Sequence, residues 1–535
     1  MGRRGGDDPG RRGERGRTGQ GAALGAGHPD GEHPVSARPG TGQEPFTGGQ
    51  GSFTGGQALF IAGEWTEPDL GHYPVTDPAT EETVGLAPEA SPAQVLAACA
   101  AARTAFGPWS RMRPEERAAL LGRAAEIIRA RLVPYADLAR AETGATTATA
   151  RALQVGVAAA RFCRYARVEP AEWPVPPQLN AAGPMGGAAV MSALAVRQPV
   201  GVVTCVTSYN NPWANPAGKI APALAMGNTV VVKPAPQDPL SVYRMAEALA
   251  EAGVPRGVVN VVSGRATAVG EAAVASPDVD MVSFTGSTAV GRRIAEVCGR
   301  DMKRQLMELG GKGAALVFAD ADLSAAVAGI GSTFSFYSGQ ICTAPTRVLA
   351  QRPVYDRLVE QLGACARRLT VGDPSDPATV VGPLISAEHR ARVESYVELG
   401  RKEGATLVTG GERPPLERGF YVSPALLADC TSDMRVAREE IFGPVVCVLP
   451  FDDEEEGIAL ADDSDYGLID YVWSADVARA FRVARRLRAG GVGINTVARN
   501  MEAPFGGFKR SGVGRDVGVY ALHAYSEVQS IVWPG

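Results

Sequence analysis

The sequence lacks both a long apolar run and a strong charge of either sign. No stretch approaches the roughly 20 uncharged apolar residues that a membrane-spanning helix needs. The formal net charge of -5 gives no electrostatic reason to expect nucleic acid or an anionic membrane surface as a partner. We therefore expect neither nucleic acid nor a membrane among the partners of this protein.

Markers of export and of histidine chemistry are absent as well. Arg3 and Arg4 are not followed by an apolar segment, so no secretory or twin-arginine signal is expected. The eight cysteines include no CxxC pair, and they should be reduced thiols in a cytoplasmic protein. His72, His389 and His523 fall in no chemical motif, so the sequence predicts no histidine base.

The chain divides at about residue 57. Residues 1–57 are rich in Gly, Pro and Arg, and they repeat a Phe-Thr-Gly-Gly-Gln unit at 46–50 and 53–57. Such a segment buries too little apolar surface to offset its ordering entropy, so it is predicted to be a disordered tail. It is either a dispensable tail, the product of an overlong start site, or a segment with a role of its own.

The remaining sequence predicts a globular α/β protein. With 535 residues and 45% apolar content, it exceeds the size of about 250 to 300 residues at which a single core stops growing. A helical stretch at 114–132 and short Val-rich runs at 199–206, 229–232 and 279–284 predict βαβ units around a parallel sheet. Gly286 and Ser287 then begin a turn into a helix, and helix N-termini of this kind bind phosphate groups.

Cys342 is the residue with the clearest chemical signal. It follows a Gly-Gln turn, where a substrate can reach it, and a thiolate is the most nucleophilic side chain near neutral pH. Glu308 stands upstream in a Glu-Leu-Gly-Gly-Lys run. The other cysteines lie in Ala-rich or Val-rich surroundings typical of core positions: Cys99, Cys163, Cys205, Cys298, Cys365, Cys430 and Cys447.

Together these motifs resemble the aldehyde dehydrogenase superfamily. The resemblance rests on Gly339-Gln340-Ile341-Cys342, the run from Glu308 to Lys312, and further motifs in the family's order at 219–224, 227–234, 284–288, 439–444 and 504–509. It implies a variant Rossmann cofactor domain at 58–181 and 198–308, an α/β catalytic domain at 309–505, and a small β oligomerisation flap at 182–197 and 517–535. In the flap, two strand-like stretches, 188–196 and 526–532, show no adjacent segment to pair with.

The resemblance also implies a mechanism. An aldehyde is oxidised to its carboxylic acid through a thiohemiacetal and a thioester on Cys342, with Asn210 as the oxyanion donor and Glu308 as the general base for hydrolysis. Lys219 and Asp516 resemble a proton relay behind Glu308. No metal is expected.

NAD is the expected cofactor, with NADP left open. Relatives have a glutamate three residues after the position of Lys233, which holds the ribose hydroxyls and would repel a 2'-phosphate, but Pro236 stands there in this chain. The expected cofactor-binding residues are Lys233, Gly264, Gly286, Ser287, Gly291, Leu309, Glu440 and Phe442.

The substrate pocket is expected to be wide. Bulky side chains of relatives are replaced by Asn211, Ala214 and Gly218, while an aromatic wall remains. The predicted lining residues are Asn211, Phe336, Ile341, Thr343 and Phe505. An aromatic aldehyde, a long aliphatic aldehyde and a semialdehyde all stay open, and Arg499 and Glu502 are candidates for reading a polar substrate group.

Two alternatives share the same scaffold. Acylating aldehyde dehydrogenases pass the thioester to coenzyme A, but they typically lack a glutamate at the position of Glu308. A catalytically silent family member would act as a binding protein, although Cys342, Glu308 and Asn210 are all present. For assembly, the resemblance implies a homodimer or a homotetramer.

Overall fold

The computed structural model describes residues 58–167, 172–180 and 189–534. The predicted tail at 1–57 and the first part of the predicted flap at 182–188 lie outside these residues. Within the described residues, no helix combines the length and apolar character needed to cross a membrane.

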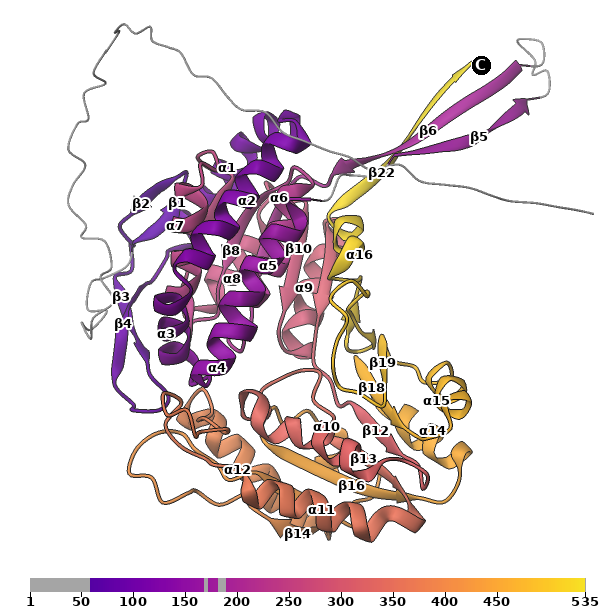
Figure 1. Cartoon of the computed structure of the whole chain (residues 1–535). Coiled ribbons are helices and arrows are strands. Elements are labelled where there is room, and N and C mark those ends of the chain that lie inside the picture. Colours follow the sequence, from indigo (N-terminus) through magenta and orange to yellow (C-terminus); the bar gives the residue numbers. More distant parts are fainter. Residues whose placement is uncertain (1–57, 168–171, 181–188, 535) are drawn as a thin grey trace, which may run out of the picture. The chain divides into compact units, whose positions relative to one another are not determined.

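The first sheet has eight strands in the order β2-β1-β9-β8-β7-β10-β11-β21 (Figure 1). Its centre is parallel, whereas β1 is antiparallel to both β2 and β9, and the edge strand β21 is antiparallel to β11. The strands span Leu59–Ile61 (β1), Glu64–Thr66 (β2), Val202–Val206 (β7), Thr229–Lys233 (β8), Val259–Val261 (β9), Met281–Thr285 (β10), Arg304–Glu308 (β11) and Gly512–Val513 (β21). The predicted strands at 199–206, 229–232 and 279–284 are confirmed as β7, β8 and β10.

Helices pack against this sheet through their apolar side chains. The predicted helix at 114–132 is confirmed as α2, and α1, α6, α7, α8 and α9 contact the central strands. The helices of this part span Pro92–Arg111 (α1), Pro114–Ala130 (α2), Leu132–Thr143 (α3), Gly156–Tyr165 (α5), Ala214–Ala225 (α6), Pro239–Glu251 (α7), Thr267–Ala275 (α8) and Thr288–Arg300 (α9). The Val-rich strands are buried on both faces, as parallel sheets covered by helices require.

The second sheet has seven strands in the order β14-β15-β16-β13-β12-β18-β19. All but the edge strand β14 are parallel to their neighbours. The strands span Ala314–Val317 (β12), Arg347–Gln351 (β13), Thr406–Thr409 (β14), Ala425–Ala428 (β15), Val445–Phe451 (β16), Ile469–Trp473 (β18) and Gly491–Ile494 (β19). Among its helices are α10 (Leu323–Ser335), α11 (Tyr355–Arg368) and α12 (Ala387–Glu403).

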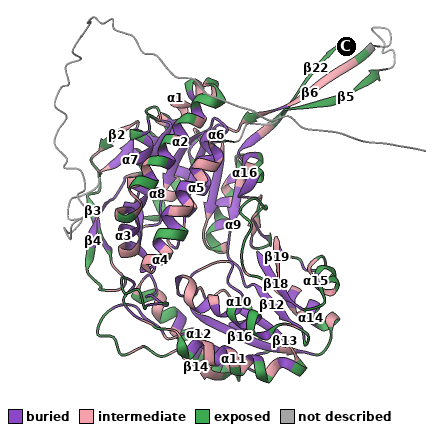
Figure 2. Cartoon of the chain, in the orientation of Figure 1, coloured by how far each residue is buried: buried purple, intermediate pink, exposed green. Residues whose placement is uncertain are grey.

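A third sheet corrects one expectation. The two stretches predicted to lack a partner pair with each other, since β22 (Ser526–Pro534) runs antiparallel to β6 (Ala189–Pro199) from Ser526↔Pro199 to Pro534↔Met191. β5 (Trp173–Asn180), which the sequence assigned to the cofactor domain, is the third strand. The alternation of apolar and polar residues along a strand does not reveal which strand it pairs with when that strand lies hundreds of residues away. The three strands extend as a ribbon, and much of it is exposed (Figures 1 and 2).

The prediction that seven cysteines fill the core is confirmed in part. Five of them are buried: Cys99, Cys205, Cys298, Cys430 and Cys447. Cys163 and Cys365 are only half-buried and pack against the margins of their cores. Both lie at the edge of the apolar face of their helix. The neighbouring residues in the sequence do not distinguish this edge from the centre of the face.

Candidate active site

Cys342 follows a loop with an unusual backbone. Tyr337 and Ser338 have φ values of 51° and 54°, and Gly339 has a φ of 74°. Left-handed conformations cost non-glycine residues about 1–3 kcal/mol and concentrate at functional sites. The conformation is held in part by Ser338, whose Oγ donates to the carbonyl of Gly382 at 2.7 Å. Gly339 has to be glycine, because a Cβ there would lie 2.1 Å from the carbonyl oxygen of Gly443.

The Glu308 motif contacts this loop directly. A Cβ built on Gly311 would lie 2.3 Å from the carbonyl oxygen of Cys342, so only glycine allows the approach. Glu308 itself ends β11, at the carboxyl edge of the first sheet, and is 5% exposed. Neither of its carboxylate oxygens has a hydrogen-bond partner among the described residues. Burial, assisted by the negative charge of Asp516, raises the pKa of Glu308 well above its usual range.

Asn210 also contacts the nucleophile loop. Its Nδ2 donates to the carbonyl of Gln340 at 2.8 Å, two residues before Cys342. Its Oδ1 accepts a hydrogen bond from Ser208 at 2.8 Å, which fixes the orientation of the amide. A side-chain amide has two N–H donors, so one remains for a further acceptor near the cysteine.

The pKa of the Cys342 thiol is raised. The residue is half-buried, and its pKa rises to about 12, first through burial and then through the charges of Glu440 and Glu308, while Arg499 acts in the opposite direction. A neutral thiol needs a base before it attacks. The raised pKa of Glu308 suits a carboxylate that takes a proton from water in a later step.

Lys219 and Asp516 both lie close behind Glu308. Lys219 donates from Nζ to Ser283 Oγ at 3.0 Å, and Ser283 is 2.8 Å from Tyr525 Oη. Burial lowers the pKa of Lys219, while Asp516 and Glu308 act in the opposite direction. Asp516 accepts a hydrogen bond at 2.8 Å from the backbone of Val517, and among the described residues no ion pair joins it to Lys219.

The predicted cofactor residues gather at the carboxyl edge of the first sheet. Lys233 ends β8, where burial lowers its pKa to about 8. Gly264 stands between β9 and α8, and Gly286 and Ser287 form the turn from β10 into α9, with Ser287 as the N-cap. A Cβ on Gly291 would lie 2.5 Å from Leu309, so the helix packs closely at its amino end.

Glu440 and Phe442 join the same region from the second half of the chain. Glu440 accepts a hydrogen bond from the backbone N–H of Gly311 at 2.9 Å, and burial raises its pKa to about 7. Phe442 has a φ of 62°. Its carbonyl is 2.7 Å from His389 Nε2, and its ring packs edge-on against Tyr209 at 5.9 Å between centroids.

The predicted pocket residues do not all have the same surroundings. Thr343 is buried beside the nucleophile, and its carbonyl accepts from Tyr471 Oη at 2.7 Å. Phe505 exchanges backbone hydrogen bonds of 2.8 and 2.6 Å with Asp516, so it lies beside the relay residues. Three predicted lining residues are half-buried around the loops of Asn210 and Cys342: Asn211, Phe336 and Ile341.

Several residues that support this site were missed by the sequence analysis. Gln154, in the π-helical turn η1 (Ala150–Val155), donates to the carbonyl of Asn210 at 3.0 Å and to Tyr337 Oη. His389, Ser283 and Tyr525 also contact site residues but stand in no motif. Single buried polar residues carry no spacing pattern, so the sequence offers no signal for them.

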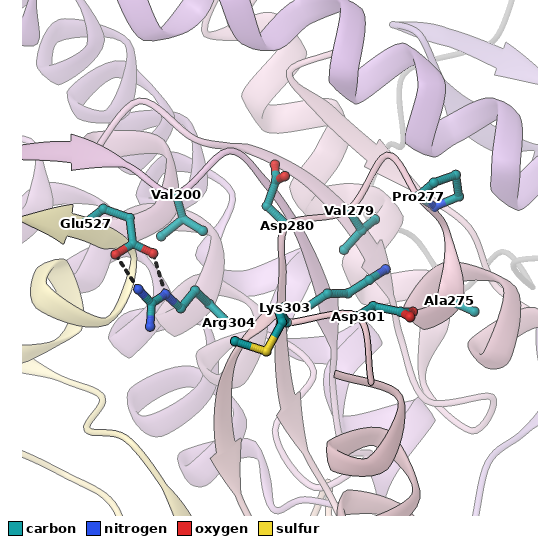
Figure 3. A pocket seen from close by; sticks show the side chains of 10 residues that line it. Val200, Ala275, Pro277, Val279, Asp280, Asp301, Lys303, Arg304 and Glu527 are labelled. Carbon is teal, nitrogen blue, oxygen red and sulfur yellow. Dashed lines mark hydrogen bonds and ion pairs between the residues drawn. The ribbon is translucent and has the colours of Figure 1, made fainter. Parts of the chain in front are cut away.

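A separate cavity lies at the opposite edge of the sheet. Figure 3 shows its lining, which includes Asp280, Lys303 and Arg304 at the amino ends of β10 and β11. Its volume is about 620 Å³. None of the predicted site residues lines it, and ligands of α/β sheets bind at the carboxyl edge.

A cysteine, a buried carboxylate and an oriented amide around one strained loop define a site for covalent catalysis by a thiol. Residues 65–531 match the model of the aldehyde dehydrogenase family, and the chain belongs to this family. The betaine aldehyde dehydrogenase of Bacillus subtilis (strain 168) is 39% identical over 482 residues, covering 88% of this chain and 96% of that protein.

Solved structures agree with this assignment. An NAD-dependent aldehyde dehydrogenase from Sinorhizobium meliloti superposes with a TM-score of 0.85 at 38% identity, covering 90% of this chain and 95% of the other. The betaine aldehyde dehydrogenase of Staphylococcus aureus, in complex with NAD+, gives a TM-score of 0.83 at 34% identity over 89% of this chain and 94% of the other. The predicted α/β fold of the family is thereby confirmed.

Proposed function

We propose that this protein oxidises an aldehyde to the carboxylic acid with NAD+, through a thioester on Cys342 that water hydrolyses. The observation that carries the proposal is the contact of two distant motifs. Gly311 lies against the carbonyl of Cys342, and the amide of Asn210 lies against Gln340 of the same loop. Nucleophile, base and oxyanion donor are thereby gathered around one backbone segment.

The residues at the carboxyl edge fit NAD+. The N-terminus of α9 offers unpaired N–H groups to a diphosphate, and Gly286 and Gly291 leave no Cβ in the way. Lys233 and Glu440 would hold the two riboses, and Phe442 would flank the nicotinamide. When bound, NAD+ supplies the hydride acceptor. Because Pro236 removes a carboxylate that would repel a 2'-phosphate, NADP+ is a second candidate for the same site.

The chain's own residues account for the other steps. Sγ of Cys342 attacks the aldehyde carbon as the thiolate, after the thiol proton has passed to water. The free N–H of Asn210 and the backbone N–H of Cys342 stabilise the resulting oxyanion. After oxidation the carbon is held as a thioester on Cys342. Glu308 then takes a proton from water, which attacks the thioester and frees the acid, while Lys219 and Asp516 pass the proton onward.

The assembly proposed is a homodimer or a homotetramer formed through the sheet of β5, β6 and β22. Large apolar side chains on this sheet face solvent, among them Leu179 at 68% and Val528 at 59% exposure. Exposed apolar strands with free edges favour pairing between copies. Light scattering of the full chain measures the mass directly, and a monomer would contradict this assignment.

The test of the activity is NAD+ and, separately, NADP+ reduction with a panel of short aliphatic, long aliphatic, aromatic and carboxylated aldehydes. Cys342→Ser should lower turnover at least about 10³-fold, because it removes the nucleophile, while NAD+ binding measured by calorimetry is unchanged. Full steady-state activity in this variant would contradict the mechanism. Formation of acyl-CoA only when coenzyme A is added would favour the acylating alternative, and absence of any thioester despite cofactor binding would favour a silent member.

A further inference from the structure

Two arginines near the candidate site have no carboxylate within ion-pair distance among the described residues. Arg161, on α5, donates from Nη1 to the carbonyl of Ala214, and within the described part of the chain no carboxylate lies within ion-pair distance of it. Arg499 places its guanidinium 4.1 Å from the centroid of the Phe505 ring and is likewise unpaired among the described residues. Both side chains therefore carry positive charge that this chain leaves uncompensated at short range.

The position of Arg161 depends on the lack of a side chain at Gly218. A Cβ built on Gly218 would lie 2.3 Å from Arg161 Nη1. Gly218 directly precedes Lys219 on α6, and Ala214 lies one turn earlier. These are two of the positions at which the chain has small residues in place of bulky ones. The guanidinium of Arg161 thus takes the space that a large side chain at position 218 would fill.

Arg499 packs on Phe505, and the loop that carries Phe505 lies next to Glu308. A Cβ on Gly506, the residue after Phe505, would lie 3.0 Å from Glu308 Oε1. The charge of Arg499 acts on both Glu308 and Cys342, whose pKa values it lowers, and it also opposes the charge of Arg161. The two guanidinium groups therefore both lie close enough to the site for their charges to act there, one from α5 and the other from the loop after β19.

No carboxylate among the described residues forms an ion pair with either arginine. Glu502 is engaged in an ion pair with Arg164. The charge of Asp516 acts on both Arg161 and Lys219, but Asp516 forms no ion pair with either of them. Arg161 is half-buried, whereas Arg499 is exposed. A half-buried guanidinium without a counter-charge is costly, and a bound carboxylate would supply that charge to Arg161 with the planar geometry that a guanidinium matches, while Arg499 could contact it from the solvent side.

We propose that the substrate is an aldehyde bearing a carboxylate at its far end, bound by Arg161 and Arg499. This inference rests on the proposed oxidation of an aldehyde and names its substrate class. It separates this chain from the similar betaine aldehyde dehydrogenases, since the quaternary ammonium of betaine aldehyde would meet two like charges.

The experiment compares para-carboxybenzaldehyde with the neutral para-carboxamide and with betaine aldehyde, for the wild type, Arg161→Gln and Arg161→Lys. We expect the wild type to prefer the carboxylate over the carboxamide in kcat/KM by at least about tenfold, the strength of a charge-assisted hydrogen bond. Arg161→Gln should lose most of that preference through KM, and Arg161→Lys should retain part of it. Arg123→Gln, an exposed arginine on α2, is the matched control and should keep the wild-type preference.

The outcomes distinguish this inference from the proposed function. Equal losses for carboxylate and carboxamide in Arg161→Gln would show that Arg161 only joins α5 to α6 and would overturn the inference. Oxidation of betaine aldehyde in preference to the carboxylate would overturn it as well, with the aldehyde dehydrogenase activity intact. If no aldehyde is oxidised, the proposed function fails, and calorimetry with terephthalate and benzoate decides the inference alone: tighter terephthalate binding by the wild type than by Arg161→Gln supports it, and equal binding rejects it.

Discussion

The two edges of the first sheet differ in whether their charged side chains are paired. At the amino edge, Asp280 accepts from Arg103 at 2.7 Å, and Arg304 pairs with Glu527 through both carboxylate oxygens (Figure 3). At the carboxyl edge, the carboxylate of Glu308 has no hydrogen-bond partner among the described residues. Paired charges stabilise a fold or cost it little, whereas an unpaired buried charge is costly and persists where a reaction or a ligand needs it.

The sharpest test of this contrast is Glu308→Gln. It should permit the first oxidation but slow thioester hydrolysis by about 10²–10⁴-fold, the usual contribution of a general base. Rapid mixing would show a burst of NADH close to one per active site, followed by a slow steady state. A variant that cycles at the wild-type rate would assign hydrolysis to another group.

The next largest effect is expected at a residue that touches no reacting atom. Gln154 holds the backbone of Asn210 and the phenol of Tyr337, so Gln154→Leu should displace the oxyanion donor and lower kcat by about 10–10²-fold with little change in KM. Tyr337→Phe is the matched control, since it removes only the hydrogen bond between Gln154 and the phenol. Equal changes in kcat and KM, or a loss of thermal stability that accounts for the inactivity, would argue against a positioning role.

The ionisation of Glu308 should also make the stability of the protein depend on pH. Its pKa is raised in the folded state, so above the unfolded value of about 4.3 the unfolded state binds fewer protons than the folded one, and stability falls as pH rises. Glu308→Gln removes this penalty. We expect the variant to be more stable than the wild type at pH 8 and no more stable at pH 4, measured as Tm at both values; a difference independent of pH would contradict the assignment.

The smallest effect is expected at the amino edge. The Arg304–Glu527 pair is largely exposed, and exposed pairs contribute about 0–1 kcal/mol. Arg304→Gln should therefore leave kcat/KM unchanged and lower Tm only slightly, by less in high salt. A marked loss of activity would show that this edge takes part in function and would break the contrast between the two edges.

Much of the local structure could be predicted from the sequence. The strands at 199–206, 229–232 and 279–284, the helix at 114–132 and the turn at Gly286 were identified from short apolar runs and glycine, because these patterns are set by neighbours in the chain. The pairing of β22 with β6 and the place of β5 in the same sheet could not be predicted, since the alternation of apolar and polar residues in a strand is the same whatever its partner.

The chemical groups of the candidate site could be read from local motifs: a reachable Cys342, a carboxylate at Glu308 and an amide at Asn210. The surroundings of these groups depend on the fold. The contact of Gln154 with Asn210, the chain from Lys219 through Ser283 to Tyr525, and the guanidinium of Arg161 over Gly218 join residues on different elements. Burial, pKa and the charge offered to a substrate depend on such contacts, because they arise from distances in space that the order of residues does not specify.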